Sequence, residues 1–211
     1  MDLGWDRTPH VLSNHAQTIF QESSDRFTLP ATLRQSITST LTASTPIRPN
    51  IRSTINDLLR DVDLSINTDV GRAGLRLTPT DEFRFDLEYS NLRRQGHRPV
   101  GTVIGSPGGS VTELAIPIEN ITHEVKVGAE YARPSWGLQF NYIGSVFGNE
   151  FDRYTWDNPL SVGNSSTTSS TGQISAAPDN FAHTLSLTGT SELPLRSRIS
   201  GTFAYTMLRQ D

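Results

Sequence analysis

Apolar and polar residues alternate along much of this chain with a period of two. In one segment, Phe83, Phe85, Leu87 and Tyr89 are separated by charged residues. Successive side chains of a β-strand point to opposite faces, so this spacing predicts a strand with one apolar and one polar face. The same pattern recurs less regularly over residues 62–78 and clearly over residues 124–131, 136–143, 184–188 and 198–206.

The predicted connections alternate in length. Pro and Asp residues predict tight turns at residues 79–82, 133–135 and 193–195, whereas residues 94–121 and 148–179 are expected to form long loops. Short turns at one end and long loops at the other are typical of bacterial outer-membrane barrels. The segments, of about 10–14 residues, are long enough to cross a bilayer. We therefore predict an all-β fold, an antiparallel up-and-down meander that is part of a large transmembrane β-barrel.

The chain divides into two parts on this interpretation. Residues 1–60 form a polar N-terminal segment with short helices or a first strand, and residues 61–211 form the barrel segment of about six strands. Within the first part, residues 1–24 are expected to be irregular, and short helices are expected at residues 29–31 and 53–60. Gly71 and Gly74 predict a bulge or bend in their strand. Fewer than about eight strands cannot close into a membrane barrel, so more strands are needed.

Composition narrows the possible functions. The 211 residues carry a formal net charge of −4, which argues against nucleic acid as a partner, and include no cysteine, which excludes disulfides, thiolate metal sites and covalent haem attachment. There is no apolar run long enough for a transmembrane helix. Residues 1–6 contain neither the basic nor the apolar region of a signal peptide, so we expect that such a peptide was removed or that the chain is an internal piece.

The polar face of the predicted strands supplies the candidate binding residues. If the apolar face meets lipid, the opposite face lines the lumen and offers contacts to a partner. For any one residue, a solvated polar face without a specific partner is the alternative. The candidate lumen-facing contacts are Arg84, Asp86, Glu88, Glu124, Lys126, Glu130, Gln139, Asn141, Thr184, Ser186, Arg198 and Thr202.

Other residue patterns indicate no catalytic or metal site. The five histidines lack the spacing of metal ligands, and Asp152, Asp157 and Asp179 lack that of a calcium loop, so we expect solvated loop carboxylates. A haem-ligand role for His123 or His183 is disfavoured. Residues 105–110 are rich in glycine but lack the ending of a phosphate-binding loop. No set of catalytic residues can be assembled, so an enzyme is the least expected class.

Residues 117–211 resemble the MtrB/PioB family of decahaem-associated outer-membrane β-barrels, and weaker matches extend upstream through residues 29–31 and 79–89. The resemblance rests on the order and spacing of short motifs. The matching residues are Pro117-Ile118, Thr122, residues 127–131, Trp136-Gly137-Leu138, Tyr142, Ser145, Phe147, Asn149, residues 156–159, Pro178-Asp179-Asn180, His183, Leu193-Pro194, Tyr205 and Gln210-Asp211.

The resemblance implies a location in the bacterial outer membrane and a partner. Members of this family form large barrels around a periplasmic multihaem c-type cytochrome, so electrons cross the outer membrane along haems that belong to the partner. This chain would then be a fragment of the barrel wall, in contact with the lipid bilayer and the cytochrome, with no cofactor of its own. Some members carry a Cys-x-x-Cys motif that is absent here, so nothing attributed to that motif carries over.

Two other functions fit the same strands. A general or substrate-specific porin would have a water-filled lumen, with a constriction loop or a ring of charges inside it. A soluble β-sandwich adhesin or carbohydrate-binding module would bury the apolar face between two sheets.

Overall fold

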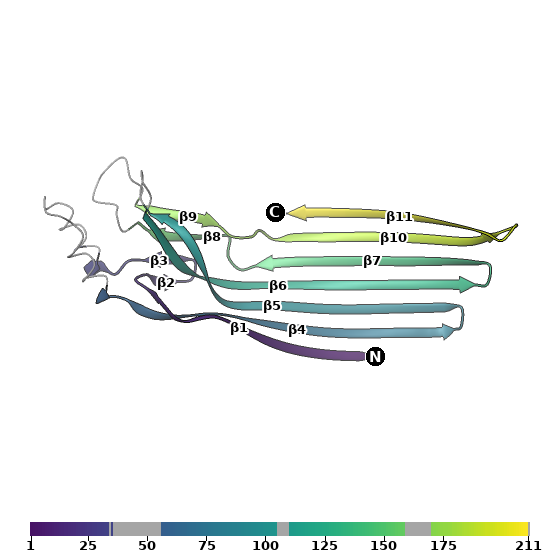
Figure 1. Ribbon diagram of the computed structural model, residues 1–211, viewed down its shortest axis with the longest axis horizontal. Helices are drawn as coiled ribbons and strands as arrows, with labels where there is room; N and C mark the ends of the chain where they lie inside the picture. The colour runs from purple at the N-terminus through teal and green to yellow at the C-terminus, as the bar shows by residue number, and fades with distance from the viewer. Residues whose placement is uncertain (34, 36–55, 105–109, 159–169, 211) are drawn as a thin grey trace.

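The computed structural model describes residues 1–33, 35, 56–104, 110–158 and 170–210, most of which lie in antiparallel strands (Figure 1). Seven long strands form one sheet in the order β1-β4-β5-β6-β7-β10-β11, in which each strand pairs with the next long strand of the chain. This is the predicted up-and-down meander. The strands are β1 (Asp2–Thr18), β4 (Arg60–Thr80), β5 (Phe83–Ile104), β6 (Ser110–Arg133), β7 (Trp136–Asn149), β10 (Asn180–Leu193) and β11 (Ser197–Gln210).

Tight turns join these strands at one end of the sheet (Figure 1). The turns follow Thr80, Arg133 and Leu193, which confirms the three turns predicted from the sequence. The turn after Leu193 contains Leu195 and Arg196 with φ of 66° and 58°, the left-handed conformation found in the tightest β-hairpins. The sheet remains open, with β1 and β11 at its two edges.

Two predictions about residues that lie in β1 and β4 are wrong. Residues 1–24 are not irregular, because β1 pairs with β4 from Asp2↔Gly74 to Thr18↔Arg60. Pro9 obscured this strand, since proline removes a ladder donor but is tolerated at an edge. Gly71 and Gly74 pair without interruption, and the register shifts instead near Ser13 of β1 and at the end of β4 after Leu77.

The long loop predicted over residues 94–121 is largely a β-ribbon. Strands β5 and β6 stay paired as far as Ile104↔Ser110, beyond Gly96, the last residue of β5 that pairs with β4, and Asn120, the last residue of β6 that pairs with β7. Pro99 and Pro117 suggested a loop, yet they occupy alternate rungs of the same ladder, opposite Ala115 and His97. The backbone nitrogen of each proline, which carries no hydrogen, can therefore face away from the partner strand.

A second, small sheet lies at the long-loop end of the molecule. It contains β2 (Gln21–Ser23), β3 (Arg26–Thr28), β8 (Arg153–Asp157) and β9 (Thr171–Ser175), and its β3–β8 pair is parallel. We call these four strands the cap. They show that residues 148–179, predicted as a loop, include a hairpin, and part of the Ser/Thr-rich tract between its strands lies outside the described residues.

The cap encloses a hydrophobic core that the sequence patterns did not predict. Leu114 and Ile116 of the ribbon contribute to it, so the cap packs on the continuation of the long sheet. Residues 31–33 are helical, as expected after Pro30. Of the helix expected at residues 53–60, residues 53–55 lie outside the described residues, and of the others only Asn56 is helical. The expectation is wrong there, because the chain turns and Arg60 already pairs with Thr18 as the start of β4. The core comprises Phe20, Phe27, Leu29, Leu33, Leu114, Ile116, Tyr154 and Trp156.

We expect Gly172→Ala to destabilise the cap, because a Cβ there would lie 2.2 Å from Cε2 of the buried Trp156 indole. Overpacking of this kind costs about 1–3 kcal/mol. In the full-length Gly172→Ala variant, the β8 and β9 amides should exchange hydrogen faster than in the parent protein. Gly101→Ala is the control, because a Cβ at Gly101 meets nothing within 4 Å. Equal protection in both variants would contradict this packing.

Candidate functional site

The twelve predicted contact residues all lie on one face of the seven-stranded sheet. Residues directly opposite each other on paired strands point to the same side of a sheet. One row across five strands joins Arg84, Glu130, Gln139, Thr188 and Thr202. The same register brings the other predicted residues to this side, which we call the polar face.

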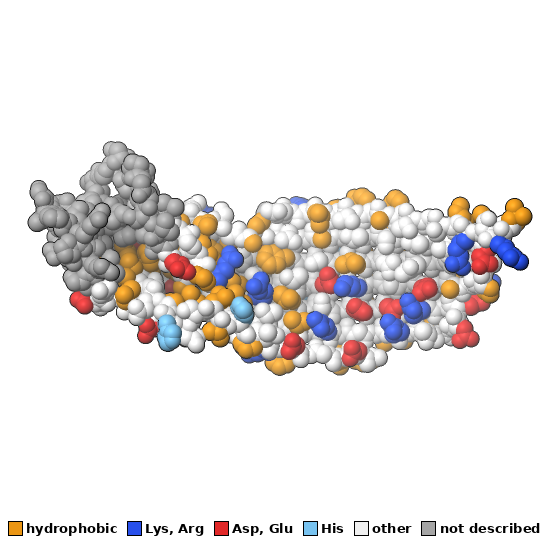
Figure 2. Space-filling view, viewed as in Figure 1, with side chains coloured by type: hydrophobic (Ala, Val, Ile, Leu, Met, Phe, Trp, Pro, Cys, Tyr) orange, Lys and Arg blue, Asp and Glu red, His pale blue; other side chains and the backbone are white. Residues whose placement is uncertain are grey.

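Charged side chains on the polar face are paired with one another (Figure 2). Arg84 Nη2 lies 2.8 Å from Glu130 Oε2, and Arg84 Nε lies 3.0 Å from Asp86 Oδ2. Asp86 also accepts a hydrogen bond from Arg76 Nε, so one carboxylate joins two guanidinium groups. Lys126 Nζ lies 2.9 Å from Glu124 Oε1. The face is therefore polar without a large region of a single charge.

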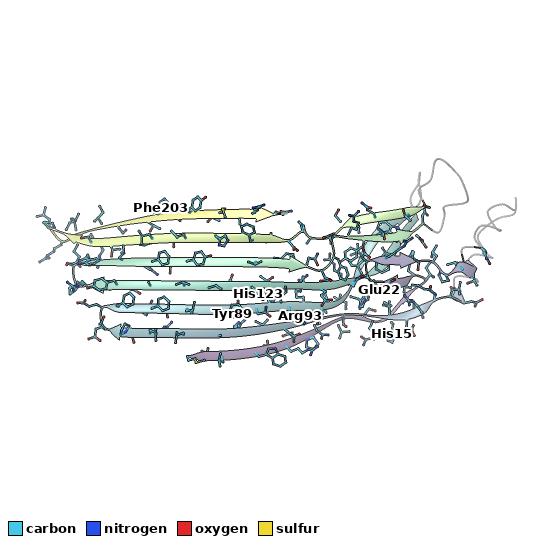
Figure 3. All side chains as sticks on the ribbon, turned by 180° about the vertical axis from the view of Figure 1, so that it is seen from behind. His15, Glu22, Tyr89, Arg93, His123 and Phe203 are labelled. Atoms are coloured by element: carbon cyan, nitrogen blue, oxygen red, sulfur yellow. The ribbon has the colours of Figure 1, made fainter. Side chains whose placement is uncertain are left out.

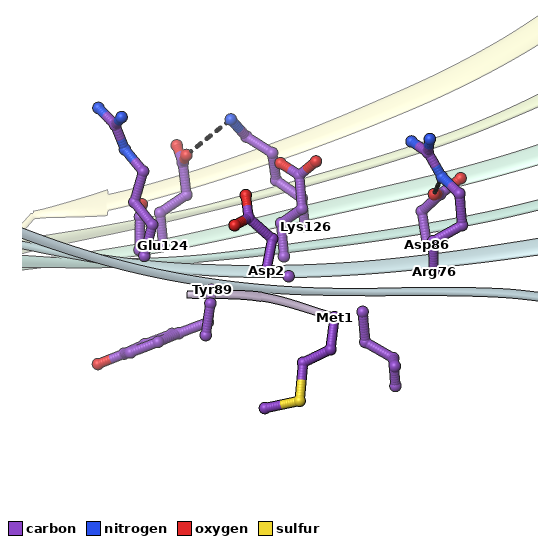
Figure 4. Close-up of a pocket in the computed structure, with 13 residues that line it drawn as sticks. Met1, Asp2, Arg76, Asp86, Tyr89, Glu124 and Lys126 are labelled. Carbon is purple, nitrogen blue, oxygen red and sulfur yellow. Dashed lines mark hydrogen bonds and ion pairs between the residues drawn. The ribbon is translucent and has the colours of Figure 1, made fainter. Parts of the chain in front are cut away.

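A shallow hollow of about 550 Å³ lies among these side chains near the sheet edge formed by β1. Figure 4 shows Asp2, Arg76, Asp86, Glu124 and Lys126 around it. Asp2, Arg72 and Arg76 also line this hollow, and none of them was among the residues predicted from the sequence. The signal that could have found the arginines is their spacing: both alternate with Ala73, Leu75 and Leu77.

The opposite face carries exposed apolar side chains. Figure 3 shows the sheet from behind, with Tyr89, His123 and Phe203 labelled. Phe203 is 64% exposed and Tyr205 is 59% exposed, and Leu75, Leu138, Leu185 and Leu187 are also exposed. An apolar surface of this extent needs a lipid or protein environment. We call it the apolar face.

At the turn end, the apolar face finishes in an aromatic pair. The Tyr131 and Trp136 rings lie 5.2 Å apart, and Tyr131 donates a 2.8 Å hydrogen bond from its hydroxyl to Glu82 Oε2. This bond, followed by the charge of Arg133, lowers the pKa of the Glu82 carboxyl in the turn. Aromatic residues with one polar contact are typical of a membrane–water boundary.

His123 and His183 also lie on the apolar face, towards its long-loop end. His123 Nδ1 is 2.8 Å from the Tyr89 hydroxyl, and His183 Nδ1 is 2.7 Å from the Tyr142 hydroxyl. They therefore point away from the polar face. Within the described ranges, no group of three or more His, Cys, Asp or Glu residues could hold a metal ion, and no helix is long and apolar enough to cross a membrane.

The three aspartates of residues 148–179 have different environments. Asp152 and Asp179 are exposed, and Asp179 Oδ1 accepts a 2.8 Å hydrogen bond from the Asn149 amide. Asp157 is buried, and its Oδ2 accepts a 2.9 Å hydrogen bond from the Leu29 amide, so the expectation of a solvated carboxylate is wrong there. The sequence could not reveal this contact because the two residues are 128 positions apart.

Polar contacts attach the cap to the ribbon. The Tyr154 hydroxyl donates a 2.8 Å hydrogen bond to the Pro117 carbonyl oxygen, and His97 Nε2 lies 3.1 Å from Glu22 Oε2. The hydrogen bond with Glu22 raises the pKa of His97 above its ordinary value, although partial burial opposes this. Protonated His97 therefore stabilises the position of β2.

We expect the cap to loosen as the pH rises. A raised pKa in the folded state means that the contribution of His97 is fully present below its unfolded pKa, about 6.5, and is lost as pH increases through the folded value. The contact is partly exposed, so its contribution is at most about 1 kcal/mol.

Hydrogen exchange of the β2 amides, compared between pH 5.5 and pH 8.5 and corrected for intrinsic exchange, would measure this loss. Glu22→Gln should remove most of the difference. If the variant kept the full pH dependence, the His97–Glu22 contact would not be its source.

Comparison with known proteins connects this geometry with a family. The family model described as "Putative outer membrane beta-barrel porin, MtrB/PioB" matches residues 1–211. The protein named "Outer membrane protein MtrB" from Shewanella baltica (strain OS185) is 29% identical over 135 residues, which cover 63% of this chain and 18% of the relative. The matched segment thus spans less than a fifth of that relative's length.

Proposed function

Because the chain belongs to the MtrB/PioB family of outer-membrane β-barrel porins, we propose that it forms part of a porin-like sheath around a multihaem c-type cytochrome. The chain is a segment of an outer-membrane β-barrel, and its family is a structural one. The sheath would hold the cytochrome across the membrane so that electrons pass along the partner's haems.

The division of the sheet into two faces carries the proposal. The apolar face is suited to hydrocarbon, and the polar face would then line the lumen. Unpaired strand edges are not tolerated in lipid, so β1 and β11 each require a further strand. The seven strands would thus be a sector of a larger closed wall.

The local pairing of charges favours a protein guest over an open ion pathway. Selective pores use rings of one charge to attract their ions. On the polar face, Arg84 is neutralised by Asp86 and Glu130, and Lys126 by Glu124. Such a surface offers hydrogen bonds and short-range charge complementarity to a folded partner, as polar protein interfaces do.

The proposed role of this chain is passive. Its apolar face would keep the barrel in the bilayer, and its polar face would orient the cytochrome and exclude lipid from it. The haems belong to the partner, and their potentials depend on burial and nearby hydrogen bonds. The wall residues would influence those potentials by limiting the access of water.

Purification of the full-length protein from outer membranes tests the proposal. We expect a haem-staining protein to remain with the barrel in mild detergent. A barrel free of haem that shows a high ionic conductance in planar bilayers would instead indicate a water-filled porin.

Arg84→Glu should weaken retention of the cytochrome by at least about fivefold, since it places a third carboxylate beside Asp86 and Glu130 on the polar face. Haem per barrel after purification would measure this. The matched control is Arg133→Glu, which also removes an arginine–glutamate contact but lies at the turn end of the apolar face. Heat-modifiable migration on gels would verify folding, and equal haem retention in both variants would contradict the assignment of the faces.

A further inference from the structure

The two Tyr–His pairs of the apolar face share one geometry. Tyr89 is followed two residues later by Asn91, which lies opposite His123, and Tyr142 is followed two residues later by Gly144, which lies opposite His183. The ring centroids are 6.1 Å and 6.0 Å apart, and both pairs of ring planes are inclined by 23°. The arrangement therefore occurs on two adjacent strand pairs, β5–β6 and β7–β10.

Gly144 makes the second pair possible. A Cβ at this position would lie 2.6 Å from the Tyr142 hydroxyl oxygen. The phenol thus lies over the glycine and reaches the histidine on the next strand. The backbone of the sheet thus places the Tyr142 side chain. Its hydroxyl contact with Nδ1 orients the His183 imidazole.

Hydrogen bonding determines which imidazole nitrogen carries the proton. The Asn91 side-chain amide nitrogen, which can only donate, lies 3.1 Å from His123 Nδ1. The Tyr89 hydroxyl lies 2.8 Å from the same Nδ1 atom. Nδ1 is therefore the acceptor, and Nε2 carries the hydrogen. Among the described residues, no hydrogen bond to Nε2 of His123 or His183 is present, so the Nε2–H of His123 is available as a donor. His183 offers the same donor when the Tyr142 hydroxyl donates to its Nδ1, as the matching geometry of the two pairs favours.

The surroundings of the two pairs favour an anionic acceptor. The two rows of the apolar face that contain Tyr89 and His123 include no Asp or Glu on any of the seven strands, all of them described at these rows. Trp5 and Asn91 provide further donor groups in the His123 row. The nearest carboxylate of this face lies one row farther towards the long loops, where Asp69 is opposite Arg93.

The height of the pairs indicates the environment of these donors. On β5, the outward residues are apolar from Phe83 to Leu87, then change to Tyr89, Asn91 and Arg93. On β5 the pairs thus mark the boundary of the apolar band on the long-loop side, whereas Ile121, Val146 and Phe181 extend the apolar surface of β6, β7 and β10 beyond the Tyr or His of the same strand. In bacterial outer-membrane barrels that side is extracellular, where the outer leaflet consists of lipopolysaccharide with a phosphorylated lipid A.

We propose that Nε2–H of His123 and of His183 bind the phosphate groups of lipid A at the outer-leaflet boundary, with Tyr89 and Tyr142 as positioning residues. The neutral imidazole donates a hydrogen bond to a charged phosphate oxygen, the stronger class of hydrogen bond. The proposal requires the apolar face to meet lipid, but it does not depend on what occupies the lumen.

Binding of diphosphoryl lipid A to the full-length barrel in detergent, measured by native mass spectrometry, tests the proposal. We expect the double variant His123→Phe/His183→Phe to bind about tenfold more weakly. The double variant with Gln at both positions, which keeps an N–H donor, should lose less. Tyr89→Phe/Tyr142→Phe should lie between the parent and the Phe variant of the histidines, because the imidazoles keep their donors but lose their orientation.

The control is Thr184→Val, which changes the neighbour of His183 on the polar face. It should bind lipid A as the parent does. Equal binding by the parent and the His123→Phe/His183→Phe variant would overturn the proposal, and so would equal binding of lipid A without its phosphates. Phosphatidylglycerol that competes as well as lipid A would also overturn the outer-leaflet assignment. The histidine variants should retain haem as the parent does. A loss of lipid A binding is then distinguishable from a failure of the proposed sheath, which would appear as a loss of haem.

Discussion

The register of the antiparallel strands is the constraint on which the rest of the structure depends. Side chains alternate between faces, so a slip of one residue would move every polar side chain of a strand to the apolar side. The pairing of β5, β6, β7, β10 and β11 is uninterrupted over the region that carries the twelve candidate residues. The register therefore creates both the charged network and the apolar surface.

The cap and the long sheet are stabilised in different ways. Within the described residues, the buried hydrophobic cluster lies between the cap, the residues that flank β2 and β3, and the ribbon, and Phe20, Leu33 and Leu114 are almost fully inaccessible. The long sheet has backbone hydrogen bonds and cross-strand pairs, but its two faces remain open. Such a sheet needs hydrocarbon on one side and water or a partner on the other. The cap, in contrast, has its own side-chain packing.

The apolar face has an ordered boundary at each end. Tyr131 and Trp136 contact each other near the tight turns, and the Tyr–His pairs lie towards the long loops. Each boundary combines aromatic rings with a hydrogen bond from a tyrosine hydroxyl, which suits a region where hydrocarbon changes to headgroups and water. On the polar face, ion pairs between described residues extend along the strands.

The alternation, the tight turns and the two faces follow from the amino-acid sequence alone, because they depend on neighbours within one strand. The period of two placed Arg84 and Glu130 on the polar side before any pairing was known, and Pro134 and Pro194 marked the ends of hairpins. The contacts between distant residues, in contrast, depend on the folded arrangement. Trp156 lies against Gly172, Asp157 accepts from Leu29, and Tyr142 reaches His183, through pairings between distant segments. Local patterns carry no information about such contacts, so proline and glycine in the ribbon suggested a loop where the partner strand maintains the ladder.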